Sequence, residues 1–468
     1  MKLRLGVLAW LLSLPLTAHG HTEIFFPRLF STAELPNTGF VLLNPDPIPS
    51  TVGLCLFKSS GLPTASDKCP AGHSASLTIP AGGQVSKLGS ELFPNATSGG
   101  WVYLINDTEG MQAFWLTYNS GLTQLDGAEA AGYDTIGPDQ IIPLVAGETE
   151  LNIVNPGFSR FLVTIRIFGE TGELAAAITR DLPIAGAFQS QVATLFPAVD
   201  MTRVRFIRVQ TAGAQIAASA VIRGFLVANE SGVINGVNVA LRTDLTFPHV
   251  VHGLLTGANY TTLIGVTNLS TARQTIRLTF NPDGGTPLEA SRTIEGNGAL
   301  RETVQSLFNL GSGFRSGWVS VTGTTALTGF AAYADSIAGG FAIVPPGIAQ
   351  SKLFFSHIAD GPPQWQTGIA LLNATDTAAA IDIFAMNPSG TLIGKTTINL
   401  EPRSKTARAL RELIPQARGI NGGFVFVRTA NNLPLFAIEL FYTEDLKVLS
   451  NVAAGKLVSG VTYAPPPL

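Results

Sequence analysis

Leu42-Leu43-Asn44, a hydrophobic pair followed by asparagine, recurs three more times along this chain of 468 residues. The later copies are Ile153-Val154-Asn155, Val266-Thr267-Asn268 and Leu371-Leu372-Asn373. Successive asparagines are 111, 113 and 105 residues apart. A period of about 110 residues is the size of one small domain, so the motif predicts four similar domains in tandem. It predicts an architecture and does not indicate a chemistry.

Other landmarks keep the same order within each copy. A Leu-Phe step, replaced by Leu-Ile in the last copy, follows each asparagine by 40 to 49 residues, and an aromatic residue comes eight or ten residues later. These aromatic residues are Trp101, Phe206, Trp318 and Phe424. An aromatic side chain that opens a strand commonly packs against the opposite sheet, so we expect these four in the core.

Within each copy, hydrophobic residues alternate with a period of two. The run 275–280 alternates in this way and leads into Asn281-Pro282-Asp283-Gly284-Gly285. Pro, Gly and Asx residues between alternating runs are typical of β-hairpins. We therefore predict an all-β fold, a tandem array of four immunoglobulin-like antiparallel β-sandwiches with about seven or eight strands each. Residues 299–308 and 404–414 are each predicted to form a short connector helix.

The same patterns predict the boundaries of the chain's parts. Each linker is a stretch where Gly, Pro and polar residues replace the alternation. We expect the sandwiches to follow one another as an elongated array. The predicted parts are a signal peptide (1–20), four sandwiches (21–133, 139–235, 245–347 and 352–463) and a proline-rich tail (464–468).

The N-terminal residues have the pattern of a secretory signal. Lys2 and Arg4 precede an apolar run over 5–16, and Ala18-His19-Gly20 places small residues at the cleavage site before His21. No later run is long enough to span a membrane, so we predict a secreted or cell-surface protein. In that oxidising setting Cys55 and Cys69 are expected to form a structural disulfide.

Composition argues against several kinds of partner. The formal net charge is −3 and only 13% of residues are charged. Nucleic-acid binding requires a basic face, and a polybasic membrane patch requires a cluster of Lys and Arg. We expect neither, and we predict no catalytic residues and no cofactor.

Several histidines and carboxylates are candidate metal ligands, but a structural or solvent-exposed role explains most of them more simply. His249 and His252 point to opposite faces of an extended strand, and His249 shares its repeat position with His357, which favours a structural role. The linker 125–139 carries Asp126, Glu129, Asp134 and Asp139, which could bind calcium, although a solvated acidic linker fits better. His21, as a new N-terminus, could hold copper as in polysaccharide monooxygenases, which is a minor alternative.

Two further aromatic residues are candidates for ligand contact. Tyr260 and Trp365 each lie eight residues before the asparagine of their copy, and Trp365 ends the loop Gly361-Pro362-Pro363-Gln364-Trp365. Exposed rings can stack on sugars or on the side chains of a partner. They are the predicted binding residues if the protein recognises a polysaccharide.

The hydrophobic-hydrophobic-Asn strand, the Pro/Asx-Gly hairpin and the Leu-Phe connector together resemble the tandem immunoglobulin-like or fibronectin-like arrays of secreted bacterial surface proteins. The resemblance covers nearly all of residues 24–463, and the cysteine and tryptophan pattern of antibody domains is absent. It implies a non-enzymatic structural or adhesion role with an extracellular protein or glycan as partner. The alternative function is polysaccharide binding, and the copper enzyme is a third.

Overall fold

The computed structural model describes residues 22–62, 64, 69, 72–121, 123–228, 230–238, 242–255, 257–361, 365–453, 455–456 and 463. The predicted signal peptide, His21 and the tail 464–468 lie outside these residues. The fold is all-β, as predicted. Seven antiparallel sheets pair into four sandwiches, and the helices between them are short.

The strands fall into four repeats. Repeat 1 contains β1 (Thr22–Phe30), β2 (Thr38–Leu43), β3 (Ser50–Phe57), β4 (Ser74–Ile79), β5 (Gln84–Leu88), β6 (Gly100–Asn106), β7 (Gln112–Tyr118), β8 (Leu125–Glu129) and β9 (Ala131–Gly132). Repeat 2 contains β10 (Asp139–Ile142), β11 (Glu148–Val154), β12 (Phe161–Gly169), β13 (Leu174–Leu182), β14 (Ala187–Gln191), β15 (Val204–Gln210), β16 (Ala217–Arg223), β17 (Ser231–Asn235) and β18 (Val237–Asn238).

Repeat 3 contains β19 (Asp244–Leu255), β20 (Ala258–Asn268), β21 (Gln274–Pro282), β22 (Leu288–Ile294), β23 (Ala299–Thr303), β24 (Arg315–Thr322), β25 (Leu327–Asp335) and β26 (Phe341–Val344). Repeat 4 contains β27 (Lys352–Phe355), β28 (Trp365–Asn373), β29 (Ala379–Met386), β30 (Leu392–Leu400), β31 (Ser404–Ala409), β32 (Phe424–Thr429), β33 (Phe436–Thr443), β34 (Leu449–Ala453) and β35 (Gly455–Lys456). Whether each repeat folds as an independent domain within the predicted boundaries stays a prediction.

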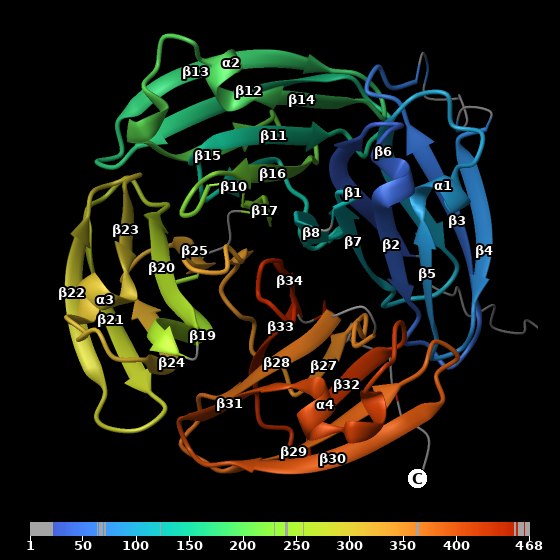
Figure 1. Ribbon diagram of the computed structural model, residues 1–468. Coiled ribbons are helices and arrows are strands. Elements are labelled where there is room, and N and C mark those ends of the chain that lie inside the picture. Colours follow the sequence, from blue (N-terminus) through green and yellow to red (C-terminus); the bar gives the residue numbers. More distant parts are fainter. Residues whose placement is uncertain are drawn as a thin grey trace, which may run out of the picture.

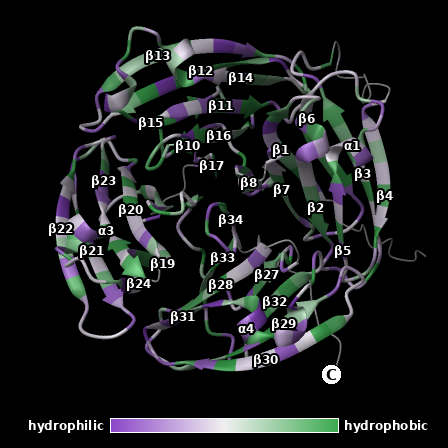
Figure 2. Cartoon of the chain, viewed as in Figure 1, coloured by the Kyte–Doolittle hydropathy of each residue, from purple (hydrophilic) through white to green (hydrophobic). Residues whose placement is uncertain are grey.

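The four repeats share one topology. In repeat 1 one sheet has the order β4-β3-β6-β1-β9 and the other β5-β2-β7-β8, and repeats 2 and 4 follow the same orders. In repeat 3 the long strand β19 pairs with β24 and then turns to pair with β20, which joins both sheets into one eight-stranded sheet. Burial alternates along outer strands such as β13, because only one face of the sheet lies against the core. Figure 2 colours the residues of the ring by hydropathy.

The predicted connector helices are shorter than expected. Residues 299–303 and 404–409 are strands β23 and β31, and only α3 (Val304–Phe308) and α4 (Leu410–Leu413) are helical. Backbone pairing with β20 and β28 overrides the helical spacing of these stretches. The equivalent helices are α1 (Gly89–Leu92) and α2 (Val192–Leu195), and single 3-10 turns lie at Leu35–Asn37, Met201–Arg203 and Pro415–Ala417.

In every repeat, the side chain of the motif's asparagine forms hydrogen bonds to the backbone of a loop and so holds that loop in place. All four asparagines are fully buried. In repeat 2, Asn155 Nδ2 donates to the carbonyls of Ser159 (2.8 Å) and Pro183 (2.6 Å), while its Oδ1 accepts from Gly157 N (2.9 Å). Asn44, Asn268 and Asn373 make the same three kinds of contact. The motif recurs because each sandwich buries these loop carbonyls, which need a donor.

The repeated aromatic residues lie between repeats, and their predicted position against the opposite sheet is wrong. Trp101, Phe206, Trp318 and Phe424 are all buried, as expected. However, Trp101 Nε1 donates to Ala185 O of repeat 2 (2.9 Å), and Trp318 Nε1 donates to Arg403 O of repeat 4 (3.3 Å). Phe424 packs with Leu43 of repeat 1. Burial against a neighbouring repeat satisfies an aromatic ring as well as a sandwich core does.

The four sandwiches close into a ring, whereas the sequence predicted an elongated array (Figure 1). Strands β8, β17, β26 and β34, which we call the axial strands, lie at the centre and contact one another cyclically, so that β34 touches β8. Three of the four joints share a backbone hydrogen bond, which runs from the first residue of a strand in one repeat to a hairpin of the preceding repeat. These bonds are Ala187 N to Ser59 O (3.0 Å), Ala299 N to Glu170 O (3.0 Å) and Gln84 N to Pro388 O (2.8 Å). The last of these joins repeat 4 to repeat 1.

Cys55 and Cys69 form the predicted disulfide in repeat 1. It links the end of β3 to the loop before β4, beside Trp101 and the joint with repeat 2. A closed loop of about 15 residues contributes about 3 kcal/mol in the chain-entropy account of disulfides.

Candidate functional site

The two predicted binding aromatics are both partly buried. Trp365 begins β28, and its carbonyl accepts a hydrogen bond from Arg411 Nη2 (3.2 Å). Tyr260 lies in β20 with its ring edge-on to Phe314, 6.3 Å between centroids. Burial, together with the charge of Asp335, raises the pKa of the Tyr260 hydroxyl. The two residues belong to different repeats, and a binding role for either stays a prediction.

The equivalent histidines His249 and His357 both lie at joints between repeats. Lys405 Nζ of repeat 4 contacts His249 Nδ1 (3.1 Å) as well as Asp283 (3.0 Å) and Ser316 (2.9 Å) of repeat 3. Burial, with the nearby ammonium, holds the pKa of His249 well below its usual value. His357 is within 3.1 Å of Gln84 Nε2, and burial lowers its pKa to about 4. Both rings are neutral parts of a joint.

The carboxylates of the first linker do not gather into a calcium site. Within the described ranges, no group of three or more His, Cys, Asp or Glu side chains could hold a metal ion. The solvated linker that the sequence favoured is also wrong for Asp126, which is buried in β8 between Arg28 (3.7 Å) and Arg223 (3.5 Å). Asp139 forms an ion pair with Arg208, whereas Glu129 and Asp134 line a chamber at the ring axis.

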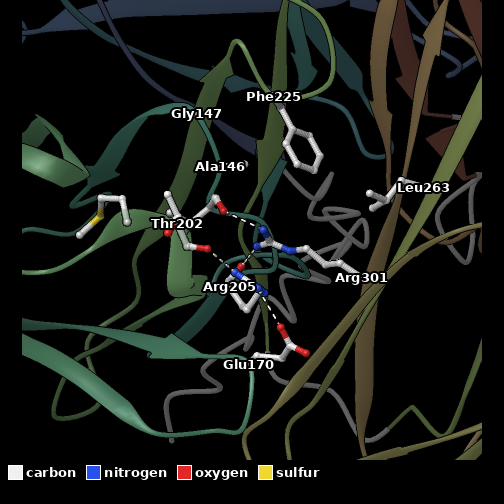
Figure 3. Close-up of a pocket in the computed structure, with 10 residues that line it drawn as sticks. Ala146, Gly147, Glu170, Thr202, Arg205, Phe225, Leu263 and Arg301 are labelled. Atoms are coloured by element: carbon white, nitrogen blue, oxygen red, sulfur yellow. Dashed lines mark hydrogen bonds and ion pairs between the residues drawn. The ribbon is translucent and has the colours of Figure 1, made fainter.

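One pocket lies at the joint between repeats 2 and 3 and encloses about 390 Å³ (Figure 3). We call it the joint pocket. Arg301 reaches across from β23 and donates to the carbonyls of Val145 (2.9 Å) and Arg205. Arg205 in turn donates to Thr202 O (2.7 Å) and pairs with Glu170 (2.8 Å). Burial beside a second guanidinium lowers the pKa of Arg301 to about 9.

A comparison between repeats explains the joint pocket. Gln189 of repeat 2 occupies the position of Arg301, and its Nε2 donates to Leu29 O (3.3 Å) of repeat 1, just as Arg301 donates to Val145 O. The side chain at this equivalent position, Gln189 or Arg301, therefore forms a hydrogen bond that links one repeat to the preceding repeat. The terminal nitrogens of both guanidinium groups already bond to carbonyls or to Glu170, while Arg301 Nε is buried without a hydrogen-bond partner among the described residues. The joint pocket is best explained as part of the scaffold.

This explanation predicts graded effects of substitution at Arg301. Arg301→Gln should lower the free energy of unfolding by about 1 kcal/mol, because glutamine can keep the bond to Val145 O, whereas Arg301→Ala should cost about 3 kcal/mol by leaving two carbonyls without donors. Denaturation by urea measures both. Equal losses in the two variants would contradict the role taken from Gln189.

A second chamber lies on the ring axis and encloses about 350 Å³, within the usual range for small-molecule sites. We call it the axial chamber. Each axial strand pairs with its neighbouring strand in the same register, and this register shows which residues of the four strands are equivalent. Equivalent residues lie around the chamber. One tier consists of Gly127, Val233, Ile343 and Asn451, and the next contains Glu129, Asn235 and Pro345.

Polar groups in the axial chamber are held by the first linker. Asn235 Nδ2 donates to Glu129 O (2.8 Å), and Gln140 Nε2 donates to Thr135 O (3.0 Å). Asn235 Oδ1 is buried with no hydrogen-bond partner in the described part of the chain, and the same is true of Asn451 Oδ1. The exposed residues Asp134 and Arg242 also line the chamber. These two amide oxygens are acceptors that have no donor among the described residues.

Sequence reasoning singled out Glu129 and Asp134 as part of an acidic linker but missed Asn235 and Asn451. Asn235 falls at a predicted boundary, and Asn451 belongs to no motif. The sequence does contain a signal for these two residues. The axial strands occupy equivalent places near the end of each repeat, so their sequences can be aligned and compared position by position. In that comparison the residues that face the axis differ in polarity from repeat to repeat.

No protein-family model and no curated protein matched the sequence. A search of solved structures found a similarity to a chain described as the tetra-tandem repeat in the extending region of a large adhesion protein. That match has 12% sequence identity, covers 88% of this chain and 92% of the other, and has a TM-score of 0.12. With so low a score, we base no argument on it.

Proposed function

We propose that this protein is a secreted, non-enzymatic interaction protein that acts as a ring-shaped scaffold of four β-sandwiches. The observation that carries the proposal is the ring closure, in which Gln84 N of repeat 1 bonds to Pro388 O of repeat 4 (2.8 Å). A closed ring holds the loops of four repeats at fixed spacing, which suits simultaneous contacts with an extracellular partner. Adhesion is the role that this geometry fits best.

The use of potentially reactive side chains supports a non-enzymatic role. His249, His357 and Lys405 are partly buried in joints between repeats and bond to neighbouring repeats. A side chain committed to holding two repeats together does not face a substrate. These residues therefore support a scaffold better than a catalytic site.

An extracellular location agrees with two observations. The Cys55–Cys69 disulfide is of the kind that persists in oxidising compartments, and the N-terminal sequence predicts export. No helix in the described part of the chain is long and apolar enough to cross a membrane.

Small-angle scattering in solution tests the ring. A compact particle of this size should have a radius of gyration of about 22 Å, whereas four such domains end to end should give about 40 Å. We expect the smaller value. A value near the larger one would show that repeats 1 and 4 are apart, and it would remove the support for a rigid scaffold.

Binding assays separate adhesion from the polysaccharide alternative. We expect the secreted protein to be retained by proteins of the cell envelope or matrix and not by a panel of insoluble glycans. Trp365→Ala and Tyr260→Ala should leave this retention unchanged, with the exposed aromatic Tyr133→Ala as the matched control. Retention on a glycan that is lost in Trp365→Ala but kept in Tyr133→Ala would favour the alternative and contradict our proposal.

A further inference from the structure

We propose that the hairpin between β19 and β20 attaches the protein to a lipid bilayer by inserting apolar side chains into the membrane interface. Leu254 and Leu255 end β19, and Ile337 belongs to the neighbouring hairpin between β25 and β26. We call these three side chains the apolar tip. The inference goes beyond the scaffold role and is independent of it.

The hairpin is a departure from the repeat. In repeat 3 the apolar start of the repeat, Phe247, lies 21 residues before Asn268, whereas the same interval in the other repeats is 13 to 18 residues. In those repeats the two strands on either side of this connection belong to different sheets. In repeat 3, β19 turns directly back into β20, with Leu255 opposite Ala258. The extra length of repeat 3 therefore forms a two-stranded ribbon.

Neighbouring segments hold the ribbon in place. His252 Nε2, near the end of β19, lies 3.2 Å from Gly311 O. At the start of β20, Asn259 N donates to Asp335 Oδ1 (2.9 Å), and Asn259 Nδ2 donates to Ser336 Oγ (2.9 Å). These bonds fix the ribbon beside the hairpin that carries Ile337. A tip that is already ordered loses little conformational entropy when it binds.

The apolar tip is exposed on both faces of the ribbon. Leu254 is 61% exposed, Leu255 45% and Ile337 60%. Successive side chains of a strand point to opposite faces, so Leu254 and Leu255 cannot both lie against one flat surface. A medium that surrounds the ribbon covers both of them. This geometry favours the apolar part of a lipid interface over a flat face of a protein partner.

The charges around the apolar tip also fit a lipid interface. Residues 253–260, 311–315 and 335–340 contain two charged side chains, Arg315 and Asp335. Asp335 is buried, whereas Arg315 is exposed and has a side chain long enough to reach lipid phosphates while its stem lies against apolar groups. An exposed carboxylate would lose its hydration on insertion and would oppose it. Because these segments carry no basic cluster, burial of apolar surface should drive binding more than lipid charge does.

Two aromatic residues lie behind the apolar tip. Tyr260 is opposite Gly253, further from the turn than the leucines, and its ring is edge-on to Phe314, 6.3 Å between centroids. Both aromatic side chains are partly buried. Tyrosine is enriched at the level of lipid headgroups, because its ring is apolar and its hydroxyl is polar. Leucines at the end of the ribbon and a tyrosine behind them match the order of polarity across a lipid interface.

Flotation of the secreted chain with vesicles of pure phosphatidylcholine tests the proposal. We expect saturable binding, and similar binding to vesicles made of equal parts of phosphatidylcholine and phosphatidylglycerol. The double variant Leu254→Ser with Leu255→Ser should bind at least about tenfold more weakly, since each leucine taken out of water contributes about that factor. The matched control is Leu162→Ser, which replaces a leucine of similar exposure (62%) in repeat 2 and should bind like the parent chain.

Leu254→Trp gives a second measurement that locates the tip directly. The fluorescence of the added tryptophan should shift to shorter wavelength on vesicles, and brominated phosphatidylcholine should quench it more strongly than it quenches the parent chain. Circular dichroism shows whether the serine variant is folded. If that variant does not fold, the quenching of Leu254→Trp still decides whether the tip enters the lipid.

Each other result would overturn the proposal. No binding of the parent chain to phosphatidylcholine, or binding that requires phosphatidylglycerol, would show that apolar insertion does not attach the protein. Equal losses in the serine variant and in Leu162→Ser would mean that lipid adsorbs to exposed leucines wherever they lie. Dimers that the serine variant loses, without vesicle binding by the parent chain, would assign the apolar tip to a second copy of the protein.

Discussion

Replacing Asn268 with alanine should lower the free energy of unfolding by about 4 kcal/mol, because each buried group left without its partner costs about 1–3 kcal/mol. Asn268 Nδ2 donates to the carbonyls of Ala272 (2.8 Å) and Glu295 (2.9 Å), and its Oδ1 accepts from Ser270 N (3.0 Å) and Gln274 Nε2 (2.7 Å). The side chain is fully buried, so water cannot replace these bonds. Urea denaturation followed by tryptophan fluorescence measures the loss.

Asn281→Ala is the matched control for this substitution. Asn281 lies in the same repeat, is partly buried and makes one long hydrogen bond to Thr279 O (3.4 Å). It should cost less than about 1 kcal/mol. Asn268→Asp should be as damaging as alanine, because a carboxylate has no donor for the two carbonyls and would be buried without a cation. A loss of similar size at Asn268 and Asn281 would contradict the role of the recurring motif.

The recurring asparagine could be found in the sequence, but its purpose could not. The spacing shows that one small unit is repeated, because period-two strands and turns return in the same order. What holds Asn155 in place is the carbonyl of Pro183, 28 residues away, at the turn before β14. Pairing across that distance depends on the way in which the loop folds back, and no local pattern reports it.

The ring closure is the largest difference from the sequence-based expectation. A hydrophobic face looks the same in sequence whether it meets the opposite sheet or a neighbouring sandwich, so the sequence alone predicts that Trp101 and Phe424 lie in a sandwich core. The closing joint also brings Val41 and Phe114 of repeat 1 against Phe441 of repeat 4, residues separated by most of the chain. Nothing in the local pattern of either repeat specifies that contact.

Departures from the repeat were more informative about function than the repeat itself. Positions with the same role in several repeats, such as His249 and His357, belong to the scaffold. The axial chamber is the place where equivalent positions differ in polarity, from Gly127 and Val233 to Asn451. Glu439 is a second such position. Its equivalents Trp115, Ala220 and Ala331 are buried and apolar, as the register of their strands shows.

Glu439 lies on β33 opposite Ile369, inside the sandwich of repeat 4. It is completely buried, and neither carboxylate oxygen has a hydrogen-bond partner within the part of the chain that the structure describes. Burial raises its pKa well above the usual value, because the charged form loses its hydration without gaining a cation. In the folded protein the side chain therefore holds its proton more tightly than in the unfolded chain, and no partner for it lies among the described residues.

Glu439→Leu should raise the free energy of unfolding at pH 7 by about 2 kcal/mol or more, since it removes an unsatisfied buried polar group at similar volume. The unfolded chain releases the proton near pH 4.5, whereas the folded chain retains it to higher pH. The parent protein is thus most stable, as far as this group is concerned, below pH 4.5 and loses stability as the pH rises towards the folded pKa. The advantage of Glu439→Leu should grow over that interval by up to about 1.4 kcal/mol per pH unit.

Denaturation curves from pH 4 to pH 8 test this dependence, with Glu401→Gln, an exposed carboxylate of the same repeat, as the control without it. Glu439→Gln keeps the shape and polarity of the side chain but cannot ionise. It should therefore remove this group's pH dependence of the free energy of unfolding, and it should recover only part of the stability gained by Glu439→Leu. If the free energies of unfolding of the parent and Glu439→Leu differed by the same amount at every pH, the charged carboxylate would have to be stabilised by a cation or by water. A loss of stability in the leucine variant would mean that repeat 4 depends on this group, and its departure from the apolar pattern would then be structural.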